Sequence, residues 1–378
     1  MRLLVLYQAS NAAADHPGFF EAFDRLVSEG SLGAHVGIPF VGVAARKGWG
    51  GLWAEAEQIA RSVEAEAVFL HFFHASMPDP TRGILRLKNL PSRPTMFTSL
   101  GDPYGHWTNR IPKSFRVASA LADVSFLTGM GSLARQLRGW GSRNLVLMPH
   151  GCCQVRFSSP ANDGQVRRQF DVAFIGSRIR SRNALGYFHR VARKRVEFVE
   201  AVTKRYGRRF GLFGHGWEGN PVWQGPIPPH RQVEAYRRSA VALGGMPNAF
   251  YDFYTSDRPF IAIASGVPFV DYWVKGVDCL LAPGRDWWLA RTQEEMFGLC
   301  DQLLEMPNEE RIRLGEAARE QVLTHHTQYH RCREMISIVK SIRDARLSGQ
   351  KAPLPKLEFL ASSHAQAPFP ESIVGWEG

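Results

Sequence analysis

Short apolar runs that are followed by stretches of helical spacing recur along this chain from its first residues. The first run is Leu3–Tyr7, and the next apolar side chains, Phe19, Phe23 and Leu26, share one face of a helix. A later run over 67–73 is apolar almost throughout, which is typical of a strand buried on both faces. This alternation of strands and helices predicts parallel sheets covered by helices, and therefore an α/β fold.

The alternation occurs twice, which indicates two domains. Residues 1–152 form the first series, and residues 153–169 lose periodicity and gain proline and polar residues, as a linker does. The pattern restarts and continues over 170–330, with a helix expected over 187–206 and a strand over 279–281. Residues 331–378 are expected to form a helix and a tail that pack back on the first domain. Two Rossmann-like domains of this kind place a ligand-binding cleft where the carboxyl ends of their sheets face each other.

The charge of the chain is positive and unevenly distributed. Its 46 Lys and Arg residues exceed its 35 Asp and Glu residues, for a net charge of +11. Between Arg167 and Arg209, 13 basic residues accompany only three acidic ones. This segment is either a solvated helix face or a field that attracts a phosphorylated or otherwise anionic ligand. No run approaches the roughly 20 apolar residues of a transmembrane helix, so we expect a cytoplasmic protein without a transmembrane segment.

Three loops in the second half carry residue types that suit an anion. A glycine after a strand lets the backbone approach a diphosphate, and nearby guanidinium groups neutralise it. Ser, Thr or Asp ahead of the predicted helix over 260–264 would cap that helix, whose start favours anions. The alternatives are a basic surface loop, a tight turn and an ordinary helix cap. The expected anion-binding residues are Gly176, Ser177, Arg178, Arg180, Gly214, His215, Gly216, Thr255, Ser256, Asp257 and Arg258.

Two side chains of the first half are candidates for proton transfer. His74 follows the buried run over 67–73, and Asp102 follows the next predicted strand, so both should lie where the cleft opens. Each could instead be a structural residue. His325 and His326 have no cysteine or acidic partners at ligand spacing, and we therefore expect no metal site.

Taken in this order, the segments resemble the GT-B nucleotide-sugar glycosyltransferases, in particular the branch typified by spore-maturation glycosyltransferase-like proteins. The resemblance is best over 171–331, where residues 255–266 look like the helix of the donor pocket, with Arg258 and Gly266 at the family spacing. Residues 326–331 resemble the terminal helix motif. In the first domain the similarity is limited to its architecture and to Asp102 and Pro103.

The resemblance implies a GT-B fold with an N-terminal acceptor domain and a C-terminal donor domain. It implies a hexosyltransferase-like enzyme that is metal-independent and retaining. A nucleoside diphosphate-sugar would be its co-substrate, with no cofactor, and its acceptor is a small molecule, glycan or protein that the sequence does not identify. Arg258 would neutralise the leaving diphosphate, and His74 or Asp102 would act as base, unless the donor phosphate takes the proton.

Two positions depart from the family pattern. Ile261 stands where relatives usually carry a glutamate that holds the donor ribose, and Phe253 stands where many retaining relatives carry an acid. Either Asp252 or Asp257 substitutes, or the donor is unusual, or catalysis has been lost.

Three other functions therefore stay open. The chain could be a noncatalytic descendant that binds a sugar nucleotide or a partner, which would account for Ile261. It could be a GT-B sugar-nucleotide epimerase, although few acidic residues accompany these motifs. A nucleic-acid-modifying transferase would suit the net charge, but the basic residues cluster in the presumed donor domain.

Overall fold

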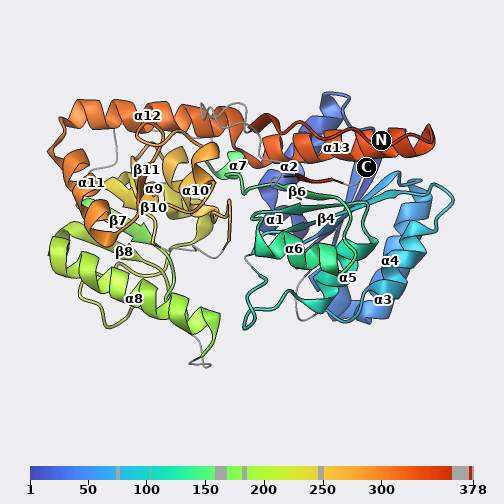
Figure 1. Cartoon of the computed structure of the whole chain (residues 1–378), viewed down its shortest axis with the longest axis horizontal. Coiled ribbons are helices and arrows are strands. Elements are labelled where there is room, and N and C mark those ends of the chain that lie inside the picture. Colours follow the sequence, from blue (N-terminus) through green and yellow to red (C-terminus); the bar gives the residue numbers. More distant parts are fainter. Residues whose placement is uncertain are drawn as a thin grey trace.

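The protein consists of two α/β lobes that lie side by side (Figure 1). The computed structural model describes residues 1–73, 77–102, 104–157, 168–180, 185–245, 251–359 and 374–376. Each lobe is built on one sheet, and the sheets have seven and five strands.

The first sheet has the order β12-β6-β5-β4-β3-β1-β2 and is parallel except for β12, which pairs with β6 in the antiparallel direction. Every residue of β3 and β4 is buried, as expected for central strands covered by helices on both faces. The strands are β1 (Arg2–Tyr7), β2 (Ala34–Pro39), β3 (Ala67–His71), β4 (Thr95–Leu100), β5 (Val124–Leu127), β6 (Leu145–Leu147) and β12 (Val374–Gly375). The helices are α1 (Ala12–Asp15), α2 (Pro17–Ser28), α3 (Phe40–Ser62), α4 (Thr81–Lys88), α5 (Lys113–Leu121), α6 (Ser132–Gly139) and α7 (Gln154–Phe157).

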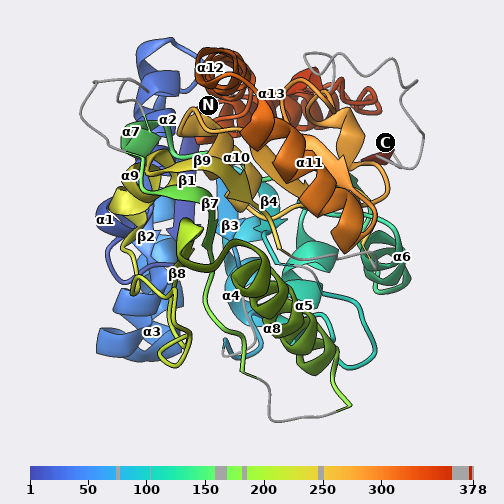
Figure 2. The same ribbon diagram turned by 90° about the vertical axis from the view of Figure 1, so that its left-hand side faces the viewer.

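The second sheet has the order β11-β10-β9-β7-β8 and is parallel throughout. Figure 2 views this lobe from its outer side, with α8 and α11 in front. The strands are β7 (Phe170–Ile175), β8 (Phe210–Phe213), β9 (Ser239–Leu243), β10 (Phe269–Tyr272) and β11 (Trp288–Ala290). The helices of this lobe are α8 (Tyr187–Tyr206), α9 (Gln232–Arg237), α10 (Arg258–Ala264), α11 (Gln293–Glu305) and α12 (Asn308–His325), and α13 (Gln328–Leu347) follows them along the chain.

Two details of the second domain differ from the sequence-based expectation. Residues 279–281 were expected to form a strand, but a 3₁₀ turn over Val277–Cys279 follows Gly276, whose φ of +87° starts a left-handed turn. The helix of the 255–266 segment begins at Arg258, and the Asp257 side chain does not cap it, although the Arg258 amide donates to Ser256 Oγ at 3.4 Å. The backbone of Asp257 is already helical (φ −69°, ψ −19°), whereas a capping residue is extended.

Two segments, one around Cys152 and one over 326–328, meet between the lobes. The amide of Cys152 donates to the His326 carbonyl at 2.9 Å, and the Gln328 amide donates to the Cys152 carbonyl at 2.9 Å. Beyond this junction α13 runs along the first domain and packs on α2 (Figure 1). The Tyr329 hydroxyl donates to Glu29 Oε2 at 2.7 Å, which ties the start of α13 to the end of α2.

Candidate functional site

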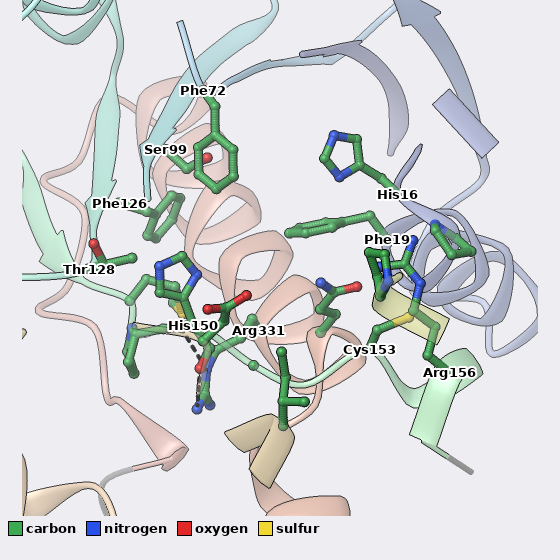
Figure 3. Close-up of a pocket in the computed structure, with 18 of the residues that line it drawn as sticks. His16, Phe19, Phe72, Ser99, Phe126, Thr128, His150, Cys153, Arg156 and Arg331 are labelled. Atoms are coloured by element: carbon green, nitrogen blue, oxygen red, sulfur yellow. Dashed lines mark hydrogen bonds between the residues drawn. The ribbon is translucent and has the colours of Figure 1, made fainter. Parts of the chain in front are cut away.

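A cavity of about 330 Å³ lies between the two domains (Figure 3). Its first wall contains the carboxyl ends of β3 to β6, including Ser99, Thr128 and His150. Its second wall contains Asp257 and Ile261 at the start of α10. The carboxyl ends of the first sheet thus face the start of a helix of the second domain across one space, and open α/β sheets bind ligands at such strand ends.

A smaller pocket of about 170 Å³ lies in the second domain at the ends of β7 and β8. Six of the expected anion-binding residues line it, from three separate segments: Gly176, Ser177, Gly214, His215, Asp257 and Arg258. We call it the donor-side pocket. Gln232, Asp257 and Ile261 line both this pocket and the interdomain cavity, so the two spaces adjoin.

Two glycines allow the loops of the donor-side pocket to touch. Gly214 has a φ of +129°, and a Cβ atom there would lie 2.6 Å from the carbonyl carbon of Gly176. Two tryptophan side chains fix these loops: Trp217 Nε1 donates to the Gly176 carbonyl at 2.8 Å and Trp223 Nε1 donates to the Gly214 carbonyl at 2.7 Å. The glycines therefore bring backbone to the pocket where a side chain would fill it.

The guanidinium group of Arg258 is anchored at one edge of this pocket. Its Nε donates to the Ile175 carbonyl at 2.8 Å, and its central carbon lies 5.2 Å from the centroid of the Phe174 ring. Its two terminal nitrogens have no hydrogen-bond partner in the part of the chain that the structure describes. The planar fork is thus held in place with donors left for an anion.

A second arginine, Arg195 of α8, lies behind the first and was not among the expected site residues. It is buried, its Nη1 donates to the Ser177 carbonyl at 2.7 Å, and its Nε is buried without a partner among the described residues. Burial and the nearby Arg258 charge lower the pKa of Arg195 to about 9. Two mutually repelling cations at this place would be stabilised by a bound anion.

Thr255 and Ser256 line a different space from the other expected residues. Together with Arg195, Arg258 and Asp271 they line a pocket of about 140 Å³. Burial raises the pKa of the Asp271 carboxyl to about 7, although its Oδ1 accepts a hydrogen bond from the Tyr272 amide at 2.8 Å.

This raised pKa predicts a pH-dependent stability. A carboxyl group with a folded-state pKa near 7 stabilises the fold below its unfolded pKa and loses that contribution as the pH rises through 7. The free energy of unfolding of the native chain should therefore fall between pH 5 and pH 8. We expect the fall in Asp271→Asn, which lacks this carboxyl group, to be smaller by on the order of 2 kcal/mol. Urea unfolding at both pH values measures this, with the exposed Asp278→Asn as control. An equal effect of pH on the native chain and on Asp271→Asn would contradict it.

The remaining expected donor residues lie outside the donor-side pocket. Arg178 and Arg180 are exposed. The Arg178 guanidinium lies 5.9 Å from the Trp217 ring centroid, and Arg180 lies near Glu218. Gly216, with a φ of +85°, forms the turn beside Arg178.

Most of the basic segment faces solvent along α8 and its ends. Three of its arginines form exposed ion pairs, Arg193 with Glu197, Arg205 with Asp301 and Arg209 with Asp171. Such pairs contribute little to stability. Of the basic residues of this segment that the structure describes, only Arg195 lines a pocket of the site.

Asp102 follows β4 and interacts electrostatically with Asp257 of the other domain. The residue is solvent-accessible, but the protein atoms around its carboxyl group raise its pKa, the His150 ring opposes this and the Asp257 carboxylate adds to it. His150 Nε2 lies 2.9 Å from the Gly101 carbonyl. The second base candidate, His74, lies outside the described residues.

The structure separates the two acids that could replace the family glutamate. Asp257 and Ile261 are one helical turn apart, with the Ile261 amide donating to the Asp257 carbonyl at 3.1 Å, and both line the donor-side pocket. Asp252 instead forms an ion pair with Lys275 at 3.4 Å and lies against Gly131 of the first domain. Of the two, only Asp257 faces the donor-side pocket.

Within the described ranges, no three His, Cys, Asp or Glu side chains come together as a possible metal site. Over the same ranges, no helix has the length and apolarity required to cross a membrane.

Comparison with known proteins agrees with this geometry. The glycosyltransferase of Rickettsia africae ESF-5 has a TM-score of 0.56 at 13% identity, covering 90% of this chain and 98% of that one. Sucrose-phosphate synthase of Thermosynechococcus elongatus has a TM-score of 0.57 at 12% identity, covering 91% and 100%. A trehalose-6-phosphate synthase has a TM-score of 0.56 at 12% identity, covering 90% and 99%. The chain has the GT-B fold.

The GT-B fold predicted from the sequence is therefore confirmed. Residues 193–337, which include α10, also match a family model described as glycosyl transferase-like. The sequence similarity thus lies in the second domain and the start of α13, and the similarity to the solved structures is one of fold. No curated protein sequence gives a significant match.

Proposed function

We propose that this GT-B protein transfers a sugar from a nucleoside diphosphate-sugar to an acceptor hydroxyl in the interdomain cavity. The proposal rests on one observation, that two pockets of the protein adjoin. The donor-side pocket, with its glycine loops and Arg258, adjoins the interdomain cavity at Gln232, Asp257 and Ile261. A sugar whose diphosphate lies in the first space would thus reach an acceptor in the second.

Negative charge develops on the leaving diphosphate as the glycosidic bond breaks, and preorganised donors at that place lower the barrier. Arg258 is the candidate for this role, because its fork is anchored through Nε and its terminal nitrogens are available. Arg195 adds positive charge behind it. We therefore assign charge neutralisation to these two side chains and expect turnover without a metal ion.

Asp257 is proposed to replace the missing glutamate of the family pattern. It lies on the same helical face as Ile261, one turn closer to the start of α10, and borders both spaces. A carboxylate at this position could accept hydrogen bonds from donor hydroxyl groups.

We also propose that the chain belongs to the spore-maturation-like branch. The segment around Arg258 and Gly266 supports this assignment.

Asp102 and the donor phosphate are the candidates for taking the acceptor proton, together with His74. Its surroundings raise the pKa of Asp102, which makes its carboxylate a stronger proton acceptor than an ordinary aspartate. Retention is the stereochemical outcome we propose. It is supported by trehalose-6-phosphate synthase, which shares this fold and whose structure was studied for glycosyl transfer with retention.

A second candidate is a noncatalytic sugar-nucleotide-binding protein, which Ile261 favours because its apolar side chain lines the donor-side pocket. Both candidates predict nucleotide binding, and only the transferase predicts turnover. Product analysis therefore separates them.

The test is a thermal-shift and calorimetric screen of nucleoside diphosphates and their sugars, in the presence of a chelator. A ligand at 100 times its Kd stabilises a fold by about 2.7 kcal/mol, so a true donor gives a clear shift. Nuclear magnetic resonance of the product anomeric proton then reports retention or inversion. Failure of every nucleotide to shift the unfolding temperature would contradict the proposal.

A further inference from the structure

We propose that the acceptor is an uncharged ring compound that carries hydroxyl groups and an apolar face, and not a phosphorylated sugar. This inference rests on the proposed function, because it assigns the interdomain cavity to the acceptor. It follows from three properties of that cavity: its aromatic wall, an unpaired buried hydroxyl group and the balance of its charges.

Aromatic rings form much of the first-domain wall of the cavity. Figure 3 shows Phe19, Phe72 and Phe126 around the space. Phe72 has a φ of +51°, which is a rare conformation for a bulky residue and is concentrated at functional sites. A Cβ atom on Gly101 would lie 2.9 Å from Phe72 Cζ and 3.1 Å from His150 Cε1. Gly101 therefore gives both rings room beside the cavity, and such rings suit the apolar face of a ring compound.

The wall is backed by an imidazole that carries no charge. His71 is fully buried, and its ring centroid lies 4.8 Å from that of His16, 5.0 Å from Phe19 and 4.0 Å from Phe72. Burial holds the pKa of His71 well below its usual range. The aromatic wall thus offers dispersion contacts and no positive charge.

Ser99 supplies a hydroxyl group for recognition of the acceptor. Ser99 lines the cavity and is only 9% exposed, and its Oγ atom is buried without a hydrogen-bond partner among the described residues. The neighbouring Thr128 hydroxyl already donates to the Gly101 carbonyl at 3.1 Å. A buried hydroxyl without a partner is costly, and an acceptor hydroxyl group at this place would satisfy it.

Apart from the imidazoles of His16 and His150, the charged side chains of the lining balance one another. Two carboxylates, Asp15 and Asp257, accompany two cations, Arg156 and Arg331, among the described lining residues. Arg331 is already engaged: its Nε donates to the Pro149 carbonyl at 3.0 Å and its Nη2 lies 2.7 Å from His326 Nδ1. Arg156 lies beside Asp15, with its Nη2 3.4 Å from the Asp15 carbonyl. A phosphate dianion in this cavity would be desolvated without a matching surplus of positive charge.

The test compares two probes that differ in one phosphate, phenyl β-glucoside and the same glucoside phosphorylated on its primary hydroxyl. Binding to the full chain is measured by saturation-transfer nuclear magnetic resonance with competition. We expect the neutral probe to bind at least about ten-fold more tightly than the phosphorylated probe. The reason is that moving an unpaired charge out of water costs more free energy than a ten-fold difference in affinity corresponds to. Equal or tighter binding of the phosphorylated probe, or no binding of the neutral probe at millimolar concentration, would overturn the proposal.

A matched pair of variants places the probe in the cavity. Ser99→Ala should weaken binding of the neutral probe by about five-fold, the usual effect of one lost hydrogen bond. Ser132→Ala is the control, because Ser132 Oγ is also buried without a partner in the described chain but Ser132 does not line the cavity. Equal effects of the two substitutions on probe binding would contradict the placement of the probe beside Ser99 in the interdomain cavity. Calorimetry with nucleoside diphosphates tests the donor pocket separately, so normal nucleotide binding alongside a failed probe test would overturn only the acceptor proposal.

Discussion

Replacing Arg258 with alanine should weaken binding of the nucleoside diphosphate by about 100-fold, since hydrogen bonds to charged groups contribute about 1.5 to 3 kcal/mol and Arg258 can donate more than one. The geometry supports this size, because the Nε bond to the Ile175 carbonyl holds the guanidinium group at the edge of the donor-side pocket. Isothermal titration calorimetry with the nucleotide identified by the screen measures the change.

Two further variants separate binding from folding at this position. Arg238→Ala removes a half-buried arginine of the same domain that lines none of the three pockets and whose Nε donates to Gln169 Oε1 at 3.1 Å, and it should leave nucleotide affinity unchanged. Arg258→Lys keeps the charge but loses the fork, so it should give an intermediate affinity. Unchanged affinity in Arg258→Ala, with a normal unfolding temperature, would remove Arg258 from the donor site.

Gly214→Ala should abolish measurable nucleotide binding and lower the unfolding temperature. The φ of +129° at Gly214 is strained for alanine, and the new Cβ atom would meet the Gly176 carbonyl carbon at 2.6 Å. The two loops would have to separate, which displaces the backbone that lines the donor-side pocket. Calorimetry and thermal unfolding report the two effects.

Gly219→Ala is the matched control, because a Cβ atom there meets nothing within 4 Å and Gly219 has no positive φ. It should bind nucleotide as the native chain does. A Gly214→Ala variant that binds as well as the Gly219→Ala control would show that the contact between the loops does not shape the pocket.

The regular elements could be predicted because local pattern and tertiary packing agree in them. The apolar runs of the first domain became buried strands, and the helix expected over 187–206 is α8. Residues 279–281 did not follow their pattern, because the left-handed turn at Gly276 redirects the chain before a strand can form. The edge strand β11, only three residues long, is too short for periodicity to indicate.

The site was predictable where its residues lie directly after a strand. Gly176, Ser177, Gly214 and His215 line the donor-side pocket because parallel strands end at the same edge. Arg178 and Arg180 lie only a few residues farther along, where the direction of the loop decides which side chains face solvent, and no sequence pattern specifies that direction.

Arg195 shows what sequence analysis could have found. It lies on the buried face of α8 with Ala192, Val199 and Val202, so it is a charged residue on an apolar stripe. A cation at such a position is buried only with a partner or for a function. In the sequence analysis, Arg195 was counted with the exposed basic residues of the same segment and was therefore not recognised as a buried charge on an apolar helix face.

Hydrogen–deuterium exchange with and without the nucleoside diphosphate-sugar tests the central claim most directly, because it locates the ligand without a mutation. The account predicts slower exchange in three separate segments at once, residues 175–177, 214–215 and 257–261, which contain most of the residues that line the donor-side pocket. Protection confined to the basic outer face of α8, with no change in those three segments, would contradict it.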